Sequence, residues 1–213
     1  MKLKNNLKLL AQEKRLHQCP IPIIGLSGSI ATGKSSACEL IKGQGLKVIS
    51  ADQLIHEIYA DNSTLDYISQ VCPQAITQKK IDFPTLRKEF FNDKSLKDKI
   101  ENYLYAKLPT QFLSKIDQTD LVVIYDVPLL YEKDLAKSVD YHGIVYASPD
   151  VQKKRLLARD KNYDEETLQK VIQSQISIEE KKEKAQFVID NNQGLDHLEQ
   201  EVKNFIKETF SKE

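Results

Sequence analysis

Long apolar segments, paired cysteines and net charge are the features that this sequence lacks. No run of about 18 apolar residues occurs, so no segment is expected to span a bilayer. The three cysteines, Cys19, Cys38 and Cys72, include no C-x-x-C pair, which argues against a disulfide framework and a zinc site and favours a reducing cytoplasm. Thirty-one basic residues balance thirty-one acidic ones, so the chain has no overall field that would attract nucleic acid or a membrane.

The first twenty residues contain no continuous apolar segment of the kind found in signal peptides. Lys8 interrupts the leucines of MKLKNNLKLLAQEKRLHQC, and the stretch is too poor in arginine and serine for a mitochondrial transit sequence. We therefore expect residues 1–20 to be an extra helix or a frayed extension. The remaining residues, 21–213, are expected to form a single domain, since neither a repeat nor a low-complexity linker divides them.

Five short apolar runs, each bounded by turn or cap residues, predict the strands of a buried sheet. Parallel strands covered on both faces have this appearance, because no polar alternation remains. Helical spacing follows in Ser35–Lys42 and Pro149–Arg159, and the alternation of strand and helix predicts a doubly wound α/β sheet. The five runs are Ile23–Leu26, Lys47–Ile49, Leu121–Val127, Gly143–Ala147 and Phe187–Ile189.

Two segments between these strands have a helical and polar composition. Residues 61–119 contain helical patterns but no strand of comparable strength, so we interpret them as a helical insertion. Residues 150–184 follow the fourth strand and end in the charge run Glu179–Lys184, which we expect to be a solvated helix face. The core of the domain is then left to residues 21–60, 120–150 and 185–213.

The stretch GSIATGKSS places two of only seven glycines around a short loop that follows the first strand. Gly28 to Ser35 fit the pattern G-x-x-x-x-G-K-[ST] in the required context, with a strand before it and a helix after it. Glycines let successive N–H groups turn inward at the positive end of the helix, where they bind phosphate. Lys34 is then expected to reach the β- and γ-phosphates, and the Ser35 hydroxyl to coordinate Mg²⁺.

The phosphate loop alone does not distinguish a kinase from a GTPase switch, a motor or a ligase. After the third strand the chain has Asp126-Val127-Pro128-Leu129, and near its end Asp190-Asn191-Asn192-Gln193. Neither stretch fits the D-x-x-G or guanine-reading motif that a regulatory GTPase needs. No Asp-Glu pair closes a strand in the manner of a motor. These absences favour a small-molecule kinase.

A kinase needs a carboxylate near the acceptor hydroxyl and cations that follow the migrating phosphoryl charge. Asp52 comes directly after the second strand and is either this base or a helix N-cap. Arg155 and Arg159 lie one helical turn apart, so both can face the same way. They form either a solvated face or a cationic lid over the triphosphate.

With these residues identified, the chain resembles the dephospho-coenzyme A kinase family from about Ile23 to Phe205. The resemblance rests on motifs in a fixed order. They are GLSGSIATGKSS, KVISAD, DVPLLYE, VQKKRLLARD, SQIS and EEKKEKAQFVIDNN.

The resemblance implies a P-loop NTPase fold with a five-stranded parallel sheet and flanking helices, a helical coenzyme A-binding region at about 61–119 and a helical lid at about 150–184. It implies transfer of the ATP γ-phosphoryl group to the 3′-hydroxyl of dephospho-coenzyme A with Mg²⁺, in a cytoplasmic monomer or small homo-oligomer. Catalytic roles fall on Lys34, Asp52 and Arg155, and Mg²⁺ binding falls on Ser35. Nucleotide contacts fall on Gly28, Ala31, Thr32, Gly33, Lys34, Ser35, Ser36, Arg159 and Asn191.

Some positions stay open or depart from the family. Asp126 either supports Mg²⁺ or caps the turn before Pro128, and Glu132 either binds substrate or pairs with a lysine. Ser50 stands where the family usually has an acidic residue, and Tyr105-Ala106 where it often has His-Pro. Another nucleoside or nucleotide kinase, and a nucleotide-binding regulator without catalysis, are the alternative functions.

Overall fold

The protein, in a computed structural model that describes residues 1–159 and 176–211, comprises two compact units. The first unit contains residues 1–50 and the described residues from 118 onward, and the second contains residues 51–117. Each unit has its own cluster of buried apolar side chains. The second unit takes in helix α2 (Ala51–Ala60) as well as most of the predicted insertion.

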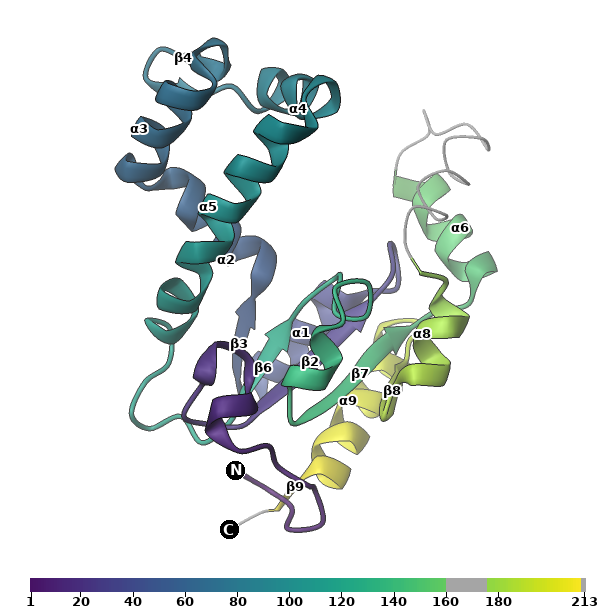
Figure 1. Cartoon of the computed structure of the whole chain (residues 1–213). Helices are drawn as coiled ribbons and strands as arrows, with labels where there is room; N and C mark the ends of the chain where they lie inside the picture. Colours follow the sequence, from purple (N-terminus) through teal and green to yellow (C-terminus); the bar gives the residue numbers. More distant parts are fainter. Residues whose placement is uncertain (160–175, 212–213) are drawn as a thin grey trace. The chain divides into compact units, whose positions relative to one another are not determined.

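The first unit is built on a parallel sheet with the strand order β3-β6-β2-β7-β8 (Figure 1). β2 lies in the middle, with β6 on one side and β7 on the other. The predicted five-stranded parallel sheet is thus confirmed, and each predicted apolar run contributes one strand. The strands are β2 (Ile23–Gly28), β3 (Lys47–Ser50), β6 (Val123–Asp126), β7 (Tyr141–Tyr146) and β8 (Phe187–Asp190).

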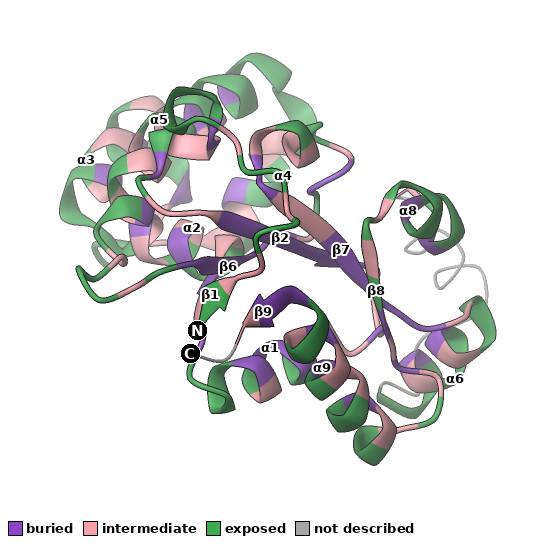
Figure 2. Cartoon of the chain, turned by 90° about the horizontal axis from the view of Figure 1, so that it is seen from below, coloured by how far each residue is buried: buried purple, intermediate pink, exposed green. Residues whose placement is uncertain are grey.

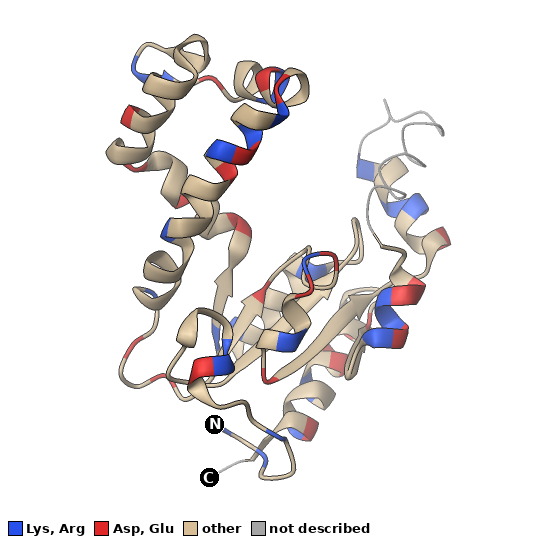
Figure 3. Ribbon diagram, viewed as in Figure 1, with Lys and Arg blue, Asp and Glu red and all other residues tan. Residues whose placement is uncertain are grey.

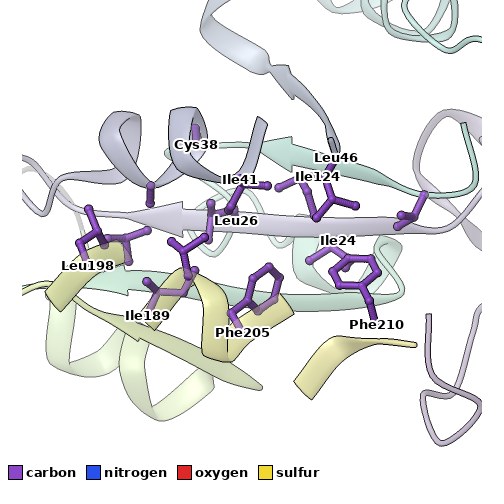
Figure 4. Close-up of a cluster of buried hydrophobic side chains, with 14 residues drawn as sticks. Ile24, Leu26, Cys38, Ile41, Leu46, Ile124, Ile189, Leu198, Phe205 and Phe210 are labelled. Carbon is purple, nitrogen blue, oxygen red and sulfur yellow. The ribbon is translucent and has the colours of Figure 1, made fainter. Parts of the chain in front are cut away.

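Helices cover both faces of this sheet, which explains why its strands are apolar on both sides. α1 (Lys34–Gly43) and α9 (Leu195–Thr209) pack on one face and share a core with alternate residues of β2, including Ile24 and Leu26 (Figure 4). α8 (Ile178–Lys184) contacts β7, and Figure 2 shows it on the opposite side from α9. α6 (Pro149–Arg159) follows β7 and has the bounds that the sequence predicts.

The first twenty residues are tied to the amino-terminal edge of the sheet. β1 (Lys2–Leu3) pairs with β9 (Phe210–Ser211), and the ends of the described chain lie side by side in Figure 1. Two short 3₁₀ helices follow, at Gln12–Lys14 and Leu16–Gln18. The expected extra helix takes the form of these two short 3₁₀ helices, and the segment is not a frayed extension, because a buried ion pair fixes it.

That ion pair joins Arg15 to Asp140, the residue before β7. The Arg15 Nε atom donates to Asp140 Oδ2 at 2.7 Å, and the two side chains are 6% and 0% exposed. Asp140 also accepts the backbone N–H groups of Leu10 and Ile23, at 2.8 and 2.7 Å. Its carboxylate therefore joins the N-terminal segment to the first residue of the central strand.

Replacing Arg15 with methionine is expected to lower the free energy of unfolding by about 3 kcal/mol, because the Asp140 carboxylate would remain buried without its cation. Urea unfolding followed by circular dichroism measures this change. Lys14→Met is the matched control, since Lys14 is exposed beside Arg15. If both variants unfold at the same urea concentration as the unchanged protein, the Arg15 pair does not hold the N-terminal segment.

The second unit is a helical cluster with one small hairpin. Its helices are α2 (Ala51–Ala60), α3 (Asn62–Val71), α4 (Phe83–Asn92) and α5 (Lys94–Leu113). α5 packs against the other three and contributes Leu96, Ile100 and Leu104 to their shared core. β4 (Ile76–Thr77) and β5 (Lys80–Ile81) form a hairpin whose two turn residues have positive φ angles, as a tight hairpin turn requires.

Charged residues of both signs are interspersed over each unit (Figure 3). Within residues 1–159 and 176–211, none of the helices combines the length and the apolar character that crossing a membrane requires.

Candidate active site

The phosphate loop connects the central strand to α1. Gly28 ends β2, Gly33 takes the N-cap position with φ +87°, and α1 begins at Lys34. Ala31 also has a left-handed conformation, with φ +58°. The loop therefore ends at the positive end of a ten-residue helix that starts from the middle of the sheet, which is the arrangement that binds phosphate groups in this type of fold.

Neither glycine of the loop leaves room for a side chain. A Cβ atom on Gly28 would lie 2.7 Å from Thr32 Oγ1. A Cβ atom on Gly33 would lie 2.1 Å from Asn191 Nδ2. The pattern of glycines is thus required by contacts within the folded loop as well as by its backbone angles.

Replacing Gly33 with alanine is expected to strain the left-handed backbone by about 1–2 kcal/mol and to displace the Asn191 side chain. We expect the KM for ATP to rise by about tenfold or more, because the loop N–H groups would lose their alignment. Steady-state kinetics and a melting curve measure the two effects. Gly43→Ala is the matched control, since a Cβ atom there meets nothing within 4 Å; equal KM values for the two variants would contradict the expectation.

Lys34 forms an ion pair with Asp126, the last residue of β6. The lysine is the first residue of α1, and Asp126 is the register partner of Leu26 in β2. The two side chains are 14% and 9% exposed. The predicted phosphate-binding cation and the acidic residue that ends β6 therefore lie together at the carboxyl end of the sheet. The sequence left Mg²⁺ support and a turn cap open for Asp126, and it did not predict this lysine partner.

Arg155 reaches across to the phosphate loop from α6. Its guanidinium donates to the carbonyl oxygens of Ala31 and Thr32 at 3.3 and 3.5 Å, and to that of Asn191 at 2.7 Å. The buried Asn191 side chain in turn donates to the Thr32 carbonyl at 2.8 Å. Arg155 and Asn191 thus hold the outer side of the loop together, although they come from different ends of the sequence.

The carbonyl contacts fix the direction of the loop N–H groups. In a trans peptide the C=O and the following N–H point in opposite directions. Where Arg155 and Asn191 bind the Ala31 and Thr32 carbonyls, the N–H groups of Thr32 and Gly33 are turned away from them. The Thr32 N–H donates to the Ser29 carbonyl oxygen within the loop at 3.3 Å, so the Gly33 N–H is the donor that these two side chains orient for phosphate binding.

The other residues predicted for the site occupy different surroundings. Ser35 and Ser36 are exposed in the first turn of α1. Arg159 is exposed at the last residue of α6, and the rest of the predicted lid up to residue 175 lies outside the described residues. Asp52 lies in the first turn of α2, which begins at Ala51, so the N-cap interpretation of Asp52 is wrong.

Asp52 belongs to the second unit, whereas the strand before it belongs to the first. β3 ends at Ser50, and Ser50 is the register partner of Asp126 in β6. The chain therefore leaves the sheet beside Asp126 and enters α2 at once. Only Ala51 separates Asp52 from that strand end along the chain, and the role of Asp52 as the base stays a prediction.

Sequence reasoning missed one buried cation close to the phosphate loop. Lys181 lies within the charge run expected to be a solvated face, yet it is 0% exposed. Its ammonium group pairs with Glu132 at 2.8 Å, so Glu132 has a lysine partner, as one of its two interpretations proposed. A sequence signal existed, because Lys181 lies three residues after the buried Ile178 on the inward face of the helix. Figure 3 shows charged residues of both signs along α8.

A parallel sheet with β2 at its centre, a phosphate loop after β2 and a cationic helix after β7 define a P-loop kinase. The profile of the dephospho-CoA kinase family matches residues 22–197. The dephospho-CoA kinase of Fusobacterium nucleatum is 35% identical over 190 residues, which cover 88% of this chain and 98% of that protein. The chain belongs to the dephospho-CoA kinase family.

Other relatives agree with this assignment. The dephospho-CoA kinase of Listeria innocua is 31% identical over 86% of this chain and 95% of its own length. The solved dephospho-CoA kinase from Campylobacter jejuni superposes with a TM-score of 0.65 at 28% identity, over 87% of this chain and 96% of that chain. The structure of TT1252 from Thermus thermophilus has a TM-score of 0.77 at 24% identity, over 90% and 99% of the two chains, and supports the fold alone.

Proposed function

We propose that this protein transfers the γ-phosphoryl group of ATP to the 3′-hydroxyl group of dephospho-coenzyme A. Family membership over residues 22–197 supports the reaction. The observation that carries it is the phosphate loop flanked by two cations, Lys34 from α1 and Arg155 from α6. Such transfers proceed through a loose transition state, for which positioning and charge neutralisation matter most.

Lys34 and Arg155 are the cations that would stabilise the negative charge of the phosphate groups during the reaction. Lys34 is held by Asp126, and the phosphates of ATP would compete with this carboxylate for the ammonium group. Arg155 would neutralise charge on the phosphoryl group as it leaves ADP. Asp52 is proposed to accept the proton of the 3′-hydroxyl. The attacking oxygen then bonds to phosphorus, and the bond to the ADP oxygen breaks.

Mg²⁺ binding is assigned to Ser35, with Asp126 as a second candidate. The Ser35 hydroxyl and the Asp126 carboxylate are the hard oxygen donors that Mg²⁺ prefers. Ser35 is exposed in the first turn of α1, one residue after Lys34. When bound, the ion supplies neutralisation of the charge shared by the β- and γ-phosphates.

The second unit is proposed to take part in binding dephospho-coenzyme A. It contains an open pocket of about 300 Å³, lined by residues of α2, α3, α4 and the β4–β5 hairpin. Lys79 and Lys80 offer cations for phosphate groups, and Tyr59 and Phe83 offer rings for an apolar arm. His56 lies in the same lining. This mixture suits a substrate that carries a diphosphate and a long, partly apolar chain.

A reducing, cytoplasmic location is proposed from the cysteines. Cys19, Cys38 and Cys72 are all buried and free. Cys38 lies in α1 beside the phosphate loop, where burial raises the pKa of its thiol to about 12. The thiol therefore remains protonated at neutral pH and takes no part in nucleophilic chemistry.

Mass spectrometry of the product tests this function. The purified protein is incubated with ATP, Mg²⁺ and dephospho-coenzyme A, and with a panel of nucleosides and nucleotides. We expect one phosphoryl group to be added to the ribose of dephospho-coenzyme A. Turnover on a different acceptor alone would identify another kinase, and binding of ATP without transfer to any acceptor would identify a nucleotide-dependent regulator.

A further inference from the structure

Lys181 is completely buried, although six of the seven residues of its helix, α8, are charged. Its Nζ atom is 2.8 Å from Glu132 Oε1, 3.0 Å from the Gly28 carbonyl oxygen and 3.1 Å from the Pro128 carbonyl oxygen. An ammonium group has three N–H donors. Each donor of Lys181 thus has one acceptor within hydrogen-bond distance.

Stability alone is a weak reason to bury a lysine. Removing an ammonium and a carboxylate from water costs several kcal/mol per ion, and an apolar pair of similar volume is often equally stable. Apolar residues close to the pair in the sequence, Ile178 in α8 and Leu130 two residues before Glu132, are also buried. The reason for a cation is therefore to be sought in the two backbone carbonyls that it binds.

The Gly28 carbonyl belongs to the first residue of the phosphate loop. Because the C=O and N–H of a trans peptide point in opposite directions, binding of this oxygen also fixes the direction of the Ser29 N–H. The contact joins residues that are 153 positions apart. Lys181 thereby holds the beginning of the loop, while Arg155 and Asn191 hold its end.

The Pro128 carbonyl belongs to the segment that follows β6. It accepts a second hydrogen bond from Ser27 Oγ at 2.9 Å, and Ser27 is the residue before Gly28. Glu132, four residues after Pro128, accepts the backbone N–H of Ile176 at 3.2 Å as well as the lysine. Lys181 therefore links β2, the segment after β6 and α8 at one point.

α8 itself is fixed to the sheet by a second contact. The Tyr146 hydroxyl donates to Glu179 Oε1 at 2.8 Å, and this hydrogen bond, with partial burial, raises the pKa of Tyr146 to about 12. The phenol therefore keeps its proton at neutral pH and remains a donor. Lys182 lies over the same ring, with its Nζ atom 4.1 Å from the ring centroid. These contacts give Lys181 a firm base from which to hold the loop.

We propose that Lys181 is a positioning residue for phosphoryl transfer, which keeps the first peptide of the phosphate loop and the segment after β6 in one arrangement through their carbonyl oxygens. The inference rests on the proposed kinase function. It assigns Lys181 no contact with ATP or with the acceptor. Its removal should therefore change ATP kinetics through the loop, independently of the stability of the fold.

The test compares Lys181→Met, Glu132→Gln and the double variant. Lys181→Met should lower the melting temperature, because Glu132 would be left partly buried without its cation. Its kcat/KM for ATP should fall about 10- to 100-fold, as expected for a displaced phosphate loop. The double variant removes the unpaired carboxylate, so its melting temperature should recover while its kcat/KM for ATP remains low. Glu132→Gln keeps a side-chain acceptor for Lys181, so its kcat/KM for ATP should stay within about threefold of that of the unchanged protein.

Lys184→Met is the matched control, since Lys184 lies on the same helix in a half-exposed pair with Glu180. All assays are run at a temperature where melting curves show every variant to be folded. Unchanged kcat/KM for ATP in folded Lys181→Met would overturn the proposal, as would a double variant that recovers stability and kinetics together. Failure of the kinase function looks different, because the unchanged protein would then not phosphorylate dephospho-coenzyme A.

Discussion

Replacing Lys34 with methionine is expected to lower kcat with ATP and dephospho-coenzyme A by about 10²- to 10³-fold, the usual effect of losing a preorganised charge contact. Methionine keeps most of the length of the side chain and removes its ammonium group, with the charge and the N–H donors. The lysine begins α1 directly after the loop, so its ammonium group is near the positive end of the helix and held by Asp126. ADP release in a coupled assay measures the rate.

Two comparisons separate this effect from damage to the fold. Lys34→Met leaves Asp126, which is 9% exposed, without its cation, so some loss of thermal stability is expected in addition. Lys42→Met removes a lysine from the other end of α1, where it forms an exposed pair with Glu39, and should leave kcat unchanged. A Lys34→Met enzyme that retains a third of the normal rate would remove Lys34 from the mechanism.

The phosphate loop and the sheet could be predicted from sequence because their signals are local. Gly28 and Gly33 are spaced along one short segment. The strand before them is a continuous apolar run, whereas the helix after them has apolar residues at helical spacing. β2 and β6 are apolar on both faces because helices or loops cover both sides of the sheet. Both features can therefore be recognised without information about residues that are distant in the sequence.

The contacts that stabilise the loop could not be predicted in the same way. Lys181 and Gly28 are 153 positions apart, and Arg155 and Ala31 are 124 apart. Each contact joins a side chain to a backbone carbonyl group. Every residue type carries this group, so the sequence does not indicate which carbonyl is bound. The charge run around Lys181 is also consistent with a fully solvated helix, since five of its six residues are exposed.

The N-terminal segment shows the same limit. Arg15 and Asp140 are 125 positions apart, and nothing around either residue marks it as buried. Residues 1–21 also lie outside the part of the chain that the family profile matches. The resemblance therefore gave no guidance there, and the lack of a continuous apolar segment left an extra helix or a frayed extension as the expectation. Only the folded chain reveals that the Asp140 carboxylate accepts hydrogen bonds from an arginine and from two backbone N–H groups.

Replacing Arg155 with alanine is expected to reduce kcat by roughly 10²-fold or more, because the guanidinium both orients the loop and neutralises the transferred group. Its planar fork contacts the carbonyls of Ala31, Thr32 and Asn191 together. Lysine cannot reproduce this fork. The kcat of Arg155→Lys should therefore be at most about tenfold higher than that of Arg155→Ala, even though lysine keeps the positive charge.

The alanine and lysine variants together distinguish orientation from charge. If charge alone matters, Arg155→Lys restores the rate almost completely; if the fork matters, both variants remain slow while the melting temperature changes little. Lys154→Ala is the matched control, since Lys154 is exposed on the same helix. A purified Arg155→Ala enzyme with a near-normal rate would remove Arg155 from the mechanism and show that the Asn191 hydrogen bond to the Thr32 carbonyl is enough to hold this end of the loop.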